Sequence, residues 1–248
     1  MTELPSVFQI AEVIRLSPGK MSEYIRAVYQ PIYSKDGLKV AGFEALARLD
    51  HPVLGSVPPA LFIETAERTG HIGEITTAIL DLSCRKCAEW NDGFVSVNIS
   101  AADLSREDLP ELVADILVKT KLHPSRLQIE VTETLAVSCD SHFSVLDRLK
   151  NMGIMTAMDD FGTGHAAGAR LFAHDWDRVK LDGGVVRACL DSGQSGKAYL
   201  NQLAEALHCL GHQVVAEGVE TNHQFRLLRE MECIDYLQGY ALGRPQPM

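Results

Sequence analysis

The chain has 248 residues, and its 33 acidic residues outnumber its 23 basic residues, giving a formal net charge of −10. This charge disfavours a DNA or RNA polymer or an anionic membrane as the partner, because both require a basic surface. It remains compatible with a small phosphate ligand whose charge is offset by metal ions, since metals are bound by acidic side chains.

One pattern recurs along the chain: a short apolar run, a turn and a longer amphipathic stretch. The runs predicted as strands are Val28–Tyr33, Val40–Ala47, Phe94–Ile99, Leu127–Val131, Ile154–Met158, Arg178–Leu181, Gln213–Ala216 and Ile234–Leu237. The stretches with helical periodicity are Pro59–Thr69, Ile72–Trp90, Leu109–Thr120, Phe143–Asn151, Lys197–Leu210 and His223–Met231. Eight strands interleaved with helices over this length fit a (β/α)8 barrel, but a doubly wound open sheet has the same periodicity.

Polar residues lie at or near the C-terminal ends of seven apolar runs. They are Glu44, Asn98, Glu130, Asp159, Lys180, Glu217 and Gln238. In a parallel barrel these ends converge on one face, where barrel enzymes build their sites. An open sheet gathers only the strand ends at its switch point. The positions of the polar residues therefore favour the barrel.

Six of the polar side chains near these ends are oxygen donors, which suit Mg²⁺ or Mn²⁺ better than zinc. They are Glu44, Asn98, Glu130, Asp159, Asp160 and Glu217. Asp159 and Asp160 are adjacent where a strand ends and the chain turns, so both carboxylates can reach a pair of metal ions. Two ions about 3.5–4 Å apart are typical of in-line displacement at phosphorus.

Lys180 is the one cation among the seven polar residues at the strand ends. It is either a salt-bridge partner of the acidic residues or a residue that orients or deprotonates an attacking water molecule. A single acidic residue in such a place is usually a helix cap or a surface charge. Burying this many carboxylates together would be very unfavourable without cations, so we interpret the set as a metal site.

Seven motifs then follow one another along the chain. They are FEALAR (Phe43–Arg48), VNIS (Val97–Ser100), EVTE (Glu130–Glu133), DDFGTG (Asp159–Gly164), VKLD (Val179–Asp182), VVAEGVE (Val214–Glu220) and YLQGYALGRP (Tyr236–Pro245). In this order they resemble EAL domains, the bacterial phosphodiesterases of the second messenger cyclic di-GMP. The resemblance runs from about Tyr29 to Pro247. It implies an α/β fold, a modified TIM barrel with one antiparallel strand, in an EAL phosphodiesterase domain of residues 29–248. Residues 1–28 fall outside the resemblance and are predicted to form a helical lead-in.

The resemblance also implies roles for individual residues. One metal ion would be held by Glu44, Asn98, Glu130 and Asp159, and the other by Asp159, Asp160 and Glu217. Lys180, Glu217 and Glu133 would be catalytic, with Lys180 acting on the nucleophilic water and Glu133 bracing the loop after Asp160. Substrate contacts would come from Gln30, Arg48 and Gln238: Arg48 would bind a phosphate and Gln238 would support the water or metal network.

The expected activity is hydrolysis of cyclic di-GMP to linear pGpG with Mg²⁺ or Mn²⁺, two ions per site. The alternative is a catalytically silent EAL module that binds cyclic di-GMP or a protein partner, and an unrelated barrel phosphohydrolase is a third possibility. Silent members typically lose carboxylates of the metal site, whereas all of them are present here.

One segment departs from the family pattern. After DFGTG the chain reads His165-Ala166-Ala167-Gly168 where family members usually have Tyr-Ser-Ser-Leu. The family uses the segment around Phe161–Leu171 for dimer contacts, so we expect a homodimer with altered regulation. With no sensory or cyclase domain recognised, control would act through the lead-in, the dimer face, a regulatory protein or expression.

Further sequence features are weaker. The widely spaced cysteines are typical of reduced thiols, and no apolar run of 18 residues or secretory leader is found, so we expect a cytoplasmic protein without a membrane partner. Cys84 and Cys87 lie in a helical pattern with no second pair, which favours packing over zinc binding. The glycines of Gly162–Gly168 lack the spacing of a dinucleotide fingerprint, and His208 and His212 lack the glutamate of a zinc protease motif.

Overall fold

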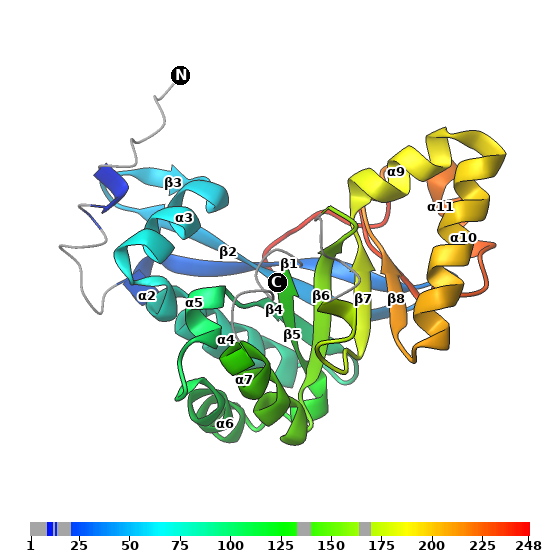
Figure 1. Ribbon diagram of the computed structural model, residues 1–248. Coiled ribbons are helices and arrows are strands. Elements are labelled where there is room, and N and C mark those ends of the chain that lie inside the picture. Colours follow the sequence, from blue (N-terminus) through cyan, green and yellow to red (C-terminus); the bar gives the residue numbers. More distant parts are fainter. Residues whose placement is uncertain (1–8, 12, 14–20, 133–139, 164–169) are drawn as a thin grey trace.

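The computed structural model describes residues 9–11, 13, 21–132, 140–163 and 170–248 (Figure 1). Its nine strands form one sheet in the order β1-β9-β8-β7-β6-β5-β4-β2-β3, and a further pairing of β1 with β2 closes eight of them into a barrel. The strands are β1 (Ile25–Ser34), β2 (Val40–His51), β3 (Gly55–Val57), β4 (Phe94–Asn98), β5 (Leu127–Thr132), β6 (Met155–Phe161), β7 (Arg178–Leu181), β8 (Gln213–Ala216) and β9 (Tyr236–Leu237). Closure confirms the barrel and excludes the open sheet.

One barrel strand runs against the others. Strand β1 is antiparallel to both of its neighbours, β2 and β9, whereas every other barrel pairing is parallel. The expected antiparallel strand is therefore confirmed. Because the remaining seven strands run in the same direction, their C-terminal ends open on the same face of the barrel.

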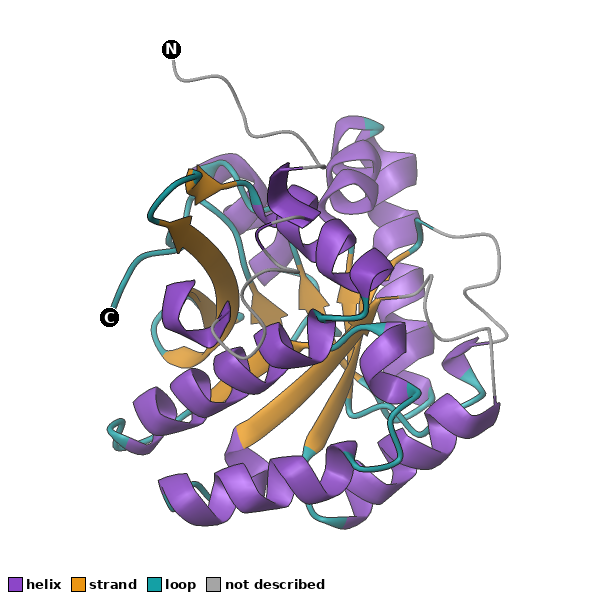
Figure 2. Ribbon diagram, turned by 90° about the vertical axis from the view of Figure 1, so that its left-hand side faces the viewer, coloured by secondary structure: helices purple, strands orange, loops and turns teal. Residues whose placement is uncertain are grey.

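Helices cover the outside of the barrel (Figure 2). They are α2 (Met21–Tyr24), α3 (Pro59–Thr69), α4 (Ile72–Ala88), α5 (Ala101–Leu104), α6 (Leu109–Thr120), the 3₁₀ helix η1 (Pro124–Arg126), α7 (Asp140–Asn151), α9 (Gly183–Asp191), α10 (Gly193–Cys209) and α11 (Asn222–Arg229). Helices α4 to α7 lie on one side, and α9 to α11 lie on the other (Figure 1). No helix of the described residues has both the length and the hydropathy required to cross a membrane.

Two predicted strands end later than expected, at positions that matter for the site. Strand β2 was expected to end at Ala47, but it continues to His51 because its last residues pair with β3, which was not predicted. Strand β6 was expected to end at Met158, but it continues to Phe161. Both extensions carry residues of the predicted site.

The predicted lead-in, residues 1–28, lies mostly outside the described residues. Residues 9–11 are helical, and Ile10 is fully buried in the main hydrophobic core. Helix α2 follows at Met21–Tyr24, and residues 25–28 already belong to β1. The last part of the predicted lead-in is therefore a barrel strand.

The hydrophobic side chains of the described residues form two cores. The larger core fills the layer between the strands and the helices and includes Cys84 and Cys87, which are buried free thiols on α4. The smaller core consists of Ile32, Phe94 and Val215, from β1, β4 and β8. These strands are not neighbours in the sheet, so their side chains meet inside the barrel. Polar side chains occupy much of the remaining interior.

Candidate metal-dependent active site

Lys180 lies at the centre of the predicted site. Its strand, β7, is buried along its whole length, and the Lys180 side chain is only 1% exposed. Its Nζ atom lies 2.7 Å from Glu217 Oε1, 2.9 Å from Glu130 Oε2, 3.0 Å from Asp159 Oδ1 and 3.5 Å from Glu44 Oε2. One buried ammonium thus joins four carboxylates from four different parts of the barrel.

Two of the three predicted amide residues contact Glu44. Asn98 Nδ2 donates to Glu44 Oε1 at 2.8 Å, and Gln238 Nε2 donates to Glu44 Oε2 at 2.7 Å. All seven polar residues predicted from the strand ends therefore meet in one network around Lys180. This convergence follows from the parallel strands, whose C-terminal ends share one face of the barrel.

A bulge in β6 brings the adjacent residues Asp159 and Asp160 to the same site. The register between β6 and β7 shifts after Met158, and the φ angle of Asp160 is +57°, in the left-handed region. Successive side chains of a regular strand point to opposite faces, and a bulge changes that direction. The left-handed backbone is unfavourable for most residues and is one way in which functional sites hold a side chain in place.

The carboxylates form two groups with the geometry of metal sites. Single oxygen atoms of Glu44, Glu130 and Asp159 lie within 4.8 Å of one another, and so do single oxygen atoms of Asp159, Asp160 and Glu217. Asp159 belongs to both groups. These are the two carboxylate sets predicted from the sequence, although their role as ligands remains a proposal.

The residues fit divalent metal ions. Five carboxylates surround one ammonium, an excess of negative charge that is unfavourable in a buried place without further cations. Buried oxygen atoms are also left without partners: Asp159 Oδ1 and Gln238 Oε1 accept no hydrogen bond of normal geometry from the described residues, although Asp159 Oδ1 faces Lys180 Nζ. The donors are all oxygen atoms, which Mg²⁺ and Mn²⁺ prefer.

Burial and mutual repulsion shift the pKa values of these groups in different directions. Burial raises the pKa of Glu130 to about 7 despite the attraction of Lys180, and burial together with the neighbouring Asp159 raises the pKa of Asp160 to about 6. The pKa of Glu217 is raised well above its usual range, chiefly by burial. Burial also acts to raise the pKa of Glu44, but Lys180 and the two amide donors outweigh it and lower that pKa.

The pKa of Lys180 is raised well above its ordinary value. Burial alone would lower it, but the surrounding carboxylates, with Asp159 foremost, outweigh burial. Lys180 is therefore a cation in this arrangement. The contacts of Lys180 are those of a salt-bridge partner. A role in orienting or deprotonating a water molecule remains a proposal.

An open cleft of about 380 Å³ leads to the cluster and is lined by Gln30, Gln238, Glu220 and Tyr240 beside the carboxylates. Gln30 Nε2 donates to Gly243 O at 3.3 Å. Arg48 lies elsewhere: its guanidinium donates to Ala47 O, and it lines a neighbouring, mostly apolar pocket of about 270 Å³. Asn98 lines the same pocket, so Arg48 lies beside the site.

Comparison with known proteins identifies the family. The sequence model of the EAL domain matches residues 20–245. The chain belongs to the EAL domain family. The family predicted from the seven motifs is thus confirmed.

Relatives and solved structures of EAL proteins agree with this assignment. The chain is 38% identical over 222 residues to an uncharacterized signaling protein of Caulobacter vibrioides, covering 89% of this chain and 27% of the relative. It is 35% identical over 225 residues to the bifunctional diguanylate cyclase/cyclic di-GMP phosphodiesterase MucR of Pseudomonas aeruginosa, covering 88% of this chain and 33% of the relative. The chain therefore spans about a third or less of these relatives.

The structure superposes on that of the MucR phosphodiesterase in complex with c-di-GMP with a TM-score of 0.86 and 31% identity, covering 96% of this chain and 98% of that one. An EAL domain protein of Listeria monocytogenes gives a TM-score of 0.85 at 27% identity, covering all of this chain and 96% of that one. The EAL fold of the chain is therefore shown.

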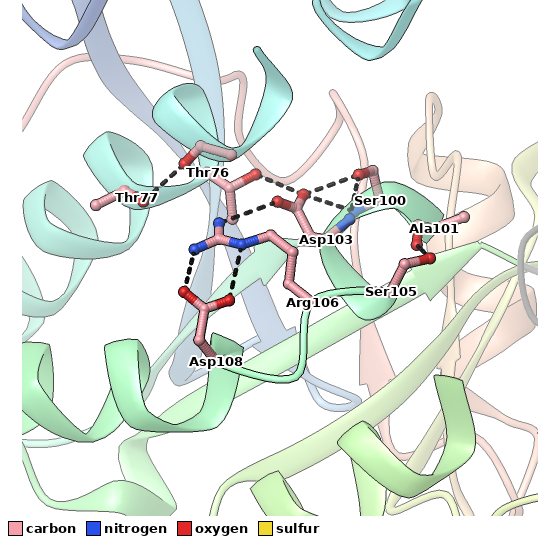
Figure 3. A network of polar contacts seen from close by, with 9 residues as sticks. Thr76, Thr77, Ser100, Ala101, Asp103, Ser105, Arg106 and Asp108 are labelled. Carbon is pink, nitrogen blue, oxygen red and sulfur yellow. Dashed lines mark hydrogen bonds and ion pairs between the residues drawn. The ribbon is translucent and has the colours of Figure 1, made fainter. Parts of the chain in front are cut away.

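A second polar network holds the turn that follows Asn98 in this EAL domain (Figure 3). Asp103 is fully buried, and its Oδ2 accepts hydrogen bonds from the Thr76 hydroxyl at 2.7 Å and the Ser100 hydroxyl at 2.8 Å. Ser100 and Asp103 also form a capping box at the start of α5. The network ties the end of β4 to helix α4 and so fixes the backbone that carries Asn98.

Sequence reasoning missed the buried residues beneath the carboxylates. Gln128 and Arg178 lie two residues before Glu130 and Lys180 on their strands and are almost fully buried. The alternation of polar residues along β5 and β7 is the signal that places them inside the barrel. Other predictions concern residues outside the described part of the chain: Glu133, the segment His165–Gly168 and most of the expected dimer segment Phe161–Leu171.

Proposed function

We propose that the protein hydrolyses cyclic di-GMP to linear pGpG in a reaction that requires Mg²⁺ or Mn²⁺. The observation that carries the proposal is the pair of carboxylate groups that share Asp159 beneath an open cleft. Membership of the EAL domain family and the similarity to the c-di-GMP complex of the MucR phosphodiesterase support this substrate. Silent EAL modules typically lose carboxylates of the metal site. All five that the family pattern requires are present here, which favours an active enzyme over a silent binding module.

Two ions would be held by the residue sets that the sequence indicates. Glu44, Glu130 and Asp159, with the Asn98 amide oxygen, would hold one, and Asp159, Asp160 and Glu217 would hold the other. When bound, such ions lower the pKa of water and stabilise negative charge at phosphorus. Lys180 and, after it, the Gln238 and Asn98 amides lower the pKa of Glu44, and the two amide hydrogen bonds orient this carboxylate within the cluster.

Lys180 would orient the attacking water by donating a hydrogen bond to it. In the metal-free protein the surrounding carboxylates outweigh burial and raise the pKa of Lys180, which favours the ammonium as a hydrogen-bond donor. The ammonium lies 2.9 Å from Glu130 Oε2 and 2.7 Å from Glu217 Oε1, between the two carboxylate groups, and this position supports a role beside the attacking water. Glu217, at the rim of β8, would complete this catalytic pair.

Residues at the cleft would bind the substrate. Gln30 and Gln238 line the cleft itself, and we propose that Gln30 contacts the ligand while Gln238 supports the metal network through Glu44. Arg48 would reach a substrate phosphate from the neighbouring pocket, with a guanidinium that matches phosphate in shape. Glu133 would brace the loop after Asp160.

A turnover assay tests the proposal. Purified protein is incubated with cyclic di-GMP and Mg²⁺ or Mn²⁺, or with EDTA, and the products are separated by liquid chromatography. We expect pGpG with either metal and no product with EDTA or with the Asp159→Asn variant. Binding of cyclic di-GMP without turnover would favour the silent module, and faster turnover of other phosphodiesters would show that cyclic di-GMP is not the preferred substrate of this EAL domain.

A further inference from the structure

We propose that Arg178 and Gln128, buried beneath the cleft, act as positioning residues that orient Glu130 for metal binding. The inference rests on the proposed function, because it assigns these residues a role toward a metal ligand. It adds to the proposed site two residues of the barrel interior, neither of which lines the cleft.

Contacts across the barrel place Arg178 below the carboxylates. Its guanidinium donates to Gln128 Oε1 on β5 and, at 3.1 Å, to Gln213 Oε1 on β8. It also lies 4.1 Å from the ring centre of Phe94 on β4 and 4.7 Å from that of Tyr236 on β9. Strands β7 and β4 are not neighbours, so the Arg178 side chain spans the interior.

The surroundings of Arg178 hold it firmly in one place. Two aromatic rings contact the guanidinium, and such contacts are strongest where water is excluded. Its hydrogen-bond acceptors among the described residues are uncharged: two amide oxygens and, at 3.5 Å, the Tyr236 hydroxyl. The buried positive charge is therefore not paired directly with a carboxylate in this set of bonds and stays available to the acidic cluster above it.

Gln128 connects Arg178 to Glu130. Its Nε2 donates to Glu130 Oε1 at 3.0 Å and to Ser96 Oγ at 2.9 Å, while its Oε1 accepts from Arg178. A reversed amide would place its oxygen against the Glu130 carboxylate and its NH₂ group against the guanidinium, so Arg178 determines which end faces Glu130.

The consequence is a fixed carboxylate. Gln128 donates a hydrogen bond to Glu130 Oε1. The other oxygen, Glu130 Oε2, is therefore directed toward Lys180 Nζ, at 2.9 Å, and toward the cleft. Residues behind metal ligands orient them in this way, and their loss typically weakens metal affinity or activity by about 10–100-fold.

Metal binding without substrate tests the proposal. Mn²⁺ affinity is measured by calorimetry on wild type, Gln128→Leu and the control Gln213→Leu. Both substitutions remove an acceptor of the same guanidinium, but only Gln128 touches a predicted ligand. We expect Gln128→Leu to bind Mn²⁺ about 10-fold more weakly or worse, with Gln213→Leu close to wild type. Equal affinity of Gln128→Leu and wild type would overturn the proposal, as would equal losses in both variants.

A second variant keeps the proposal testable if Gln128→Leu does not fold. Gln128→Asn keeps an amide in the barrel but is one methylene too short to reach Glu130 and Arg178 together. We expect it to gain less thermal stability from saturating Mn²⁺ than wild type, each compared with its own metal-free form. An undiminished gain in a folded Gln128→Asn would contradict the positioning role. If wild type itself binds no Mn²⁺, the proposed metal-dependent function fails instead, so the two failures are distinguishable.

Discussion

The ammonium nitrogen of Lys180 lies 2.7 Å from Oε1 of Glu217, the shortest of its four carboxylate contacts. Among the described residues, Lys180 is the cation in direct contact with these carboxylates, and it cannot neutralise their negative charge alone. Protonation of the cluster should consequently stabilise the metal-free fold, and divalent ions should do the same at higher pH.

We predict that the Glu130 carboxyl makes the metal-free protein lose stability as pH rises from about 4.5 to about 7. Its folded pKa is raised to about 7, so the folded state binds more protons than the unfolded state in this range. Thermal melts in EDTA of wild type and Glu130→Gln check this prediction, because the glutamine has the same size and cannot ionise.

The expected result is that Glu130→Gln becomes more stable relative to wild type between pH 5 and pH 8. Comparing the two proteins cancels His51 and His174, whose pKa values are lowered by burial and which act in the opposite direction. A stability difference that does not change with pH would show that Glu130 is not titrating in this range.

Glu44→Ala should abolish turnover without unfolding the protein. Loss of a predicted ligand should exceed the roughly 10–100-fold effects of residues that only support ligands. The Asn98 and Gln238 amides lose their acceptor, which should destabilise the fold by about 1–3 kcal/mol. Activity assays and chemical denaturation measure both effects. The control is Asp50→Ala, on the same strand but in an exposed ion pair with Arg26, and it should retain activity. Near wild-type turnover of Glu44→Ala would refute the assignment of Glu44 as a metal ligand.

Variants of Asp160 should separate the effect of its backbone conformation on stability from the effect of its carboxylate on turnover. Asparagine tolerates the left-handed φ of this position better than alanine, for which that conformation is unfavourable by about 1–2 kcal/mol. We therefore expect Asp160→Asn to be more stable than Asp160→Ala in metal-free denaturation experiments, while both lose turnover. Equal stability of the two would argue against the strained bulge.

Calcium should support substrate binding but not cleavage. Ca²⁺ takes the same oxygen ligands at about 2.3–2.6 Å, whereas Mg²⁺ requires about 2.0–2.1 Å, so Ca²⁺ should misplace the reacting groups. Calorimetry with cyclic di-GMP and a turnover assay in Ca²⁺ measure the two properties separately. Turnover in Ca²⁺ as fast as in Mg²⁺ would mean that the geometry of the ions is not critical.

Much of the site was predictable because parallel strands of a barrel end on one face. A polar residue at the end of an apolar run, such as Glu44 or Glu130, is thereby placed in space without knowledge of any contact. The pair Asp159 and Asp160 was predicted to reach one site, and the bulge at Asp160 is the physical reason that both can.

Other features depend on pairing and packing that periodicity does not encode. The pocket that Arg48 shares with Asn98, next to the cleft, could not be located from periodicity, and the role of Arg48 toward a phosphate stays a prediction. Helix α9 begins with two glycines, which are poor helix formers, and was not predicted. The role of Arg178 depends on contacts across the barrel that no local pattern contains.

The most direct test of the account is one Mn²⁺ titration that follows bound ions by electron paramagnetic resonance and cyclic di-GMP turnover in the same samples. The two carboxylate groups that share Asp159 predict two Mn²⁺ per chain, with pGpG formed only as the ions bind, and neither binding nor turnover in Asp159→Asn. Turnover in the absence of bound Mn²⁺ or of any other divalent ion, or two bound ions without any pGpG, would contradict the account.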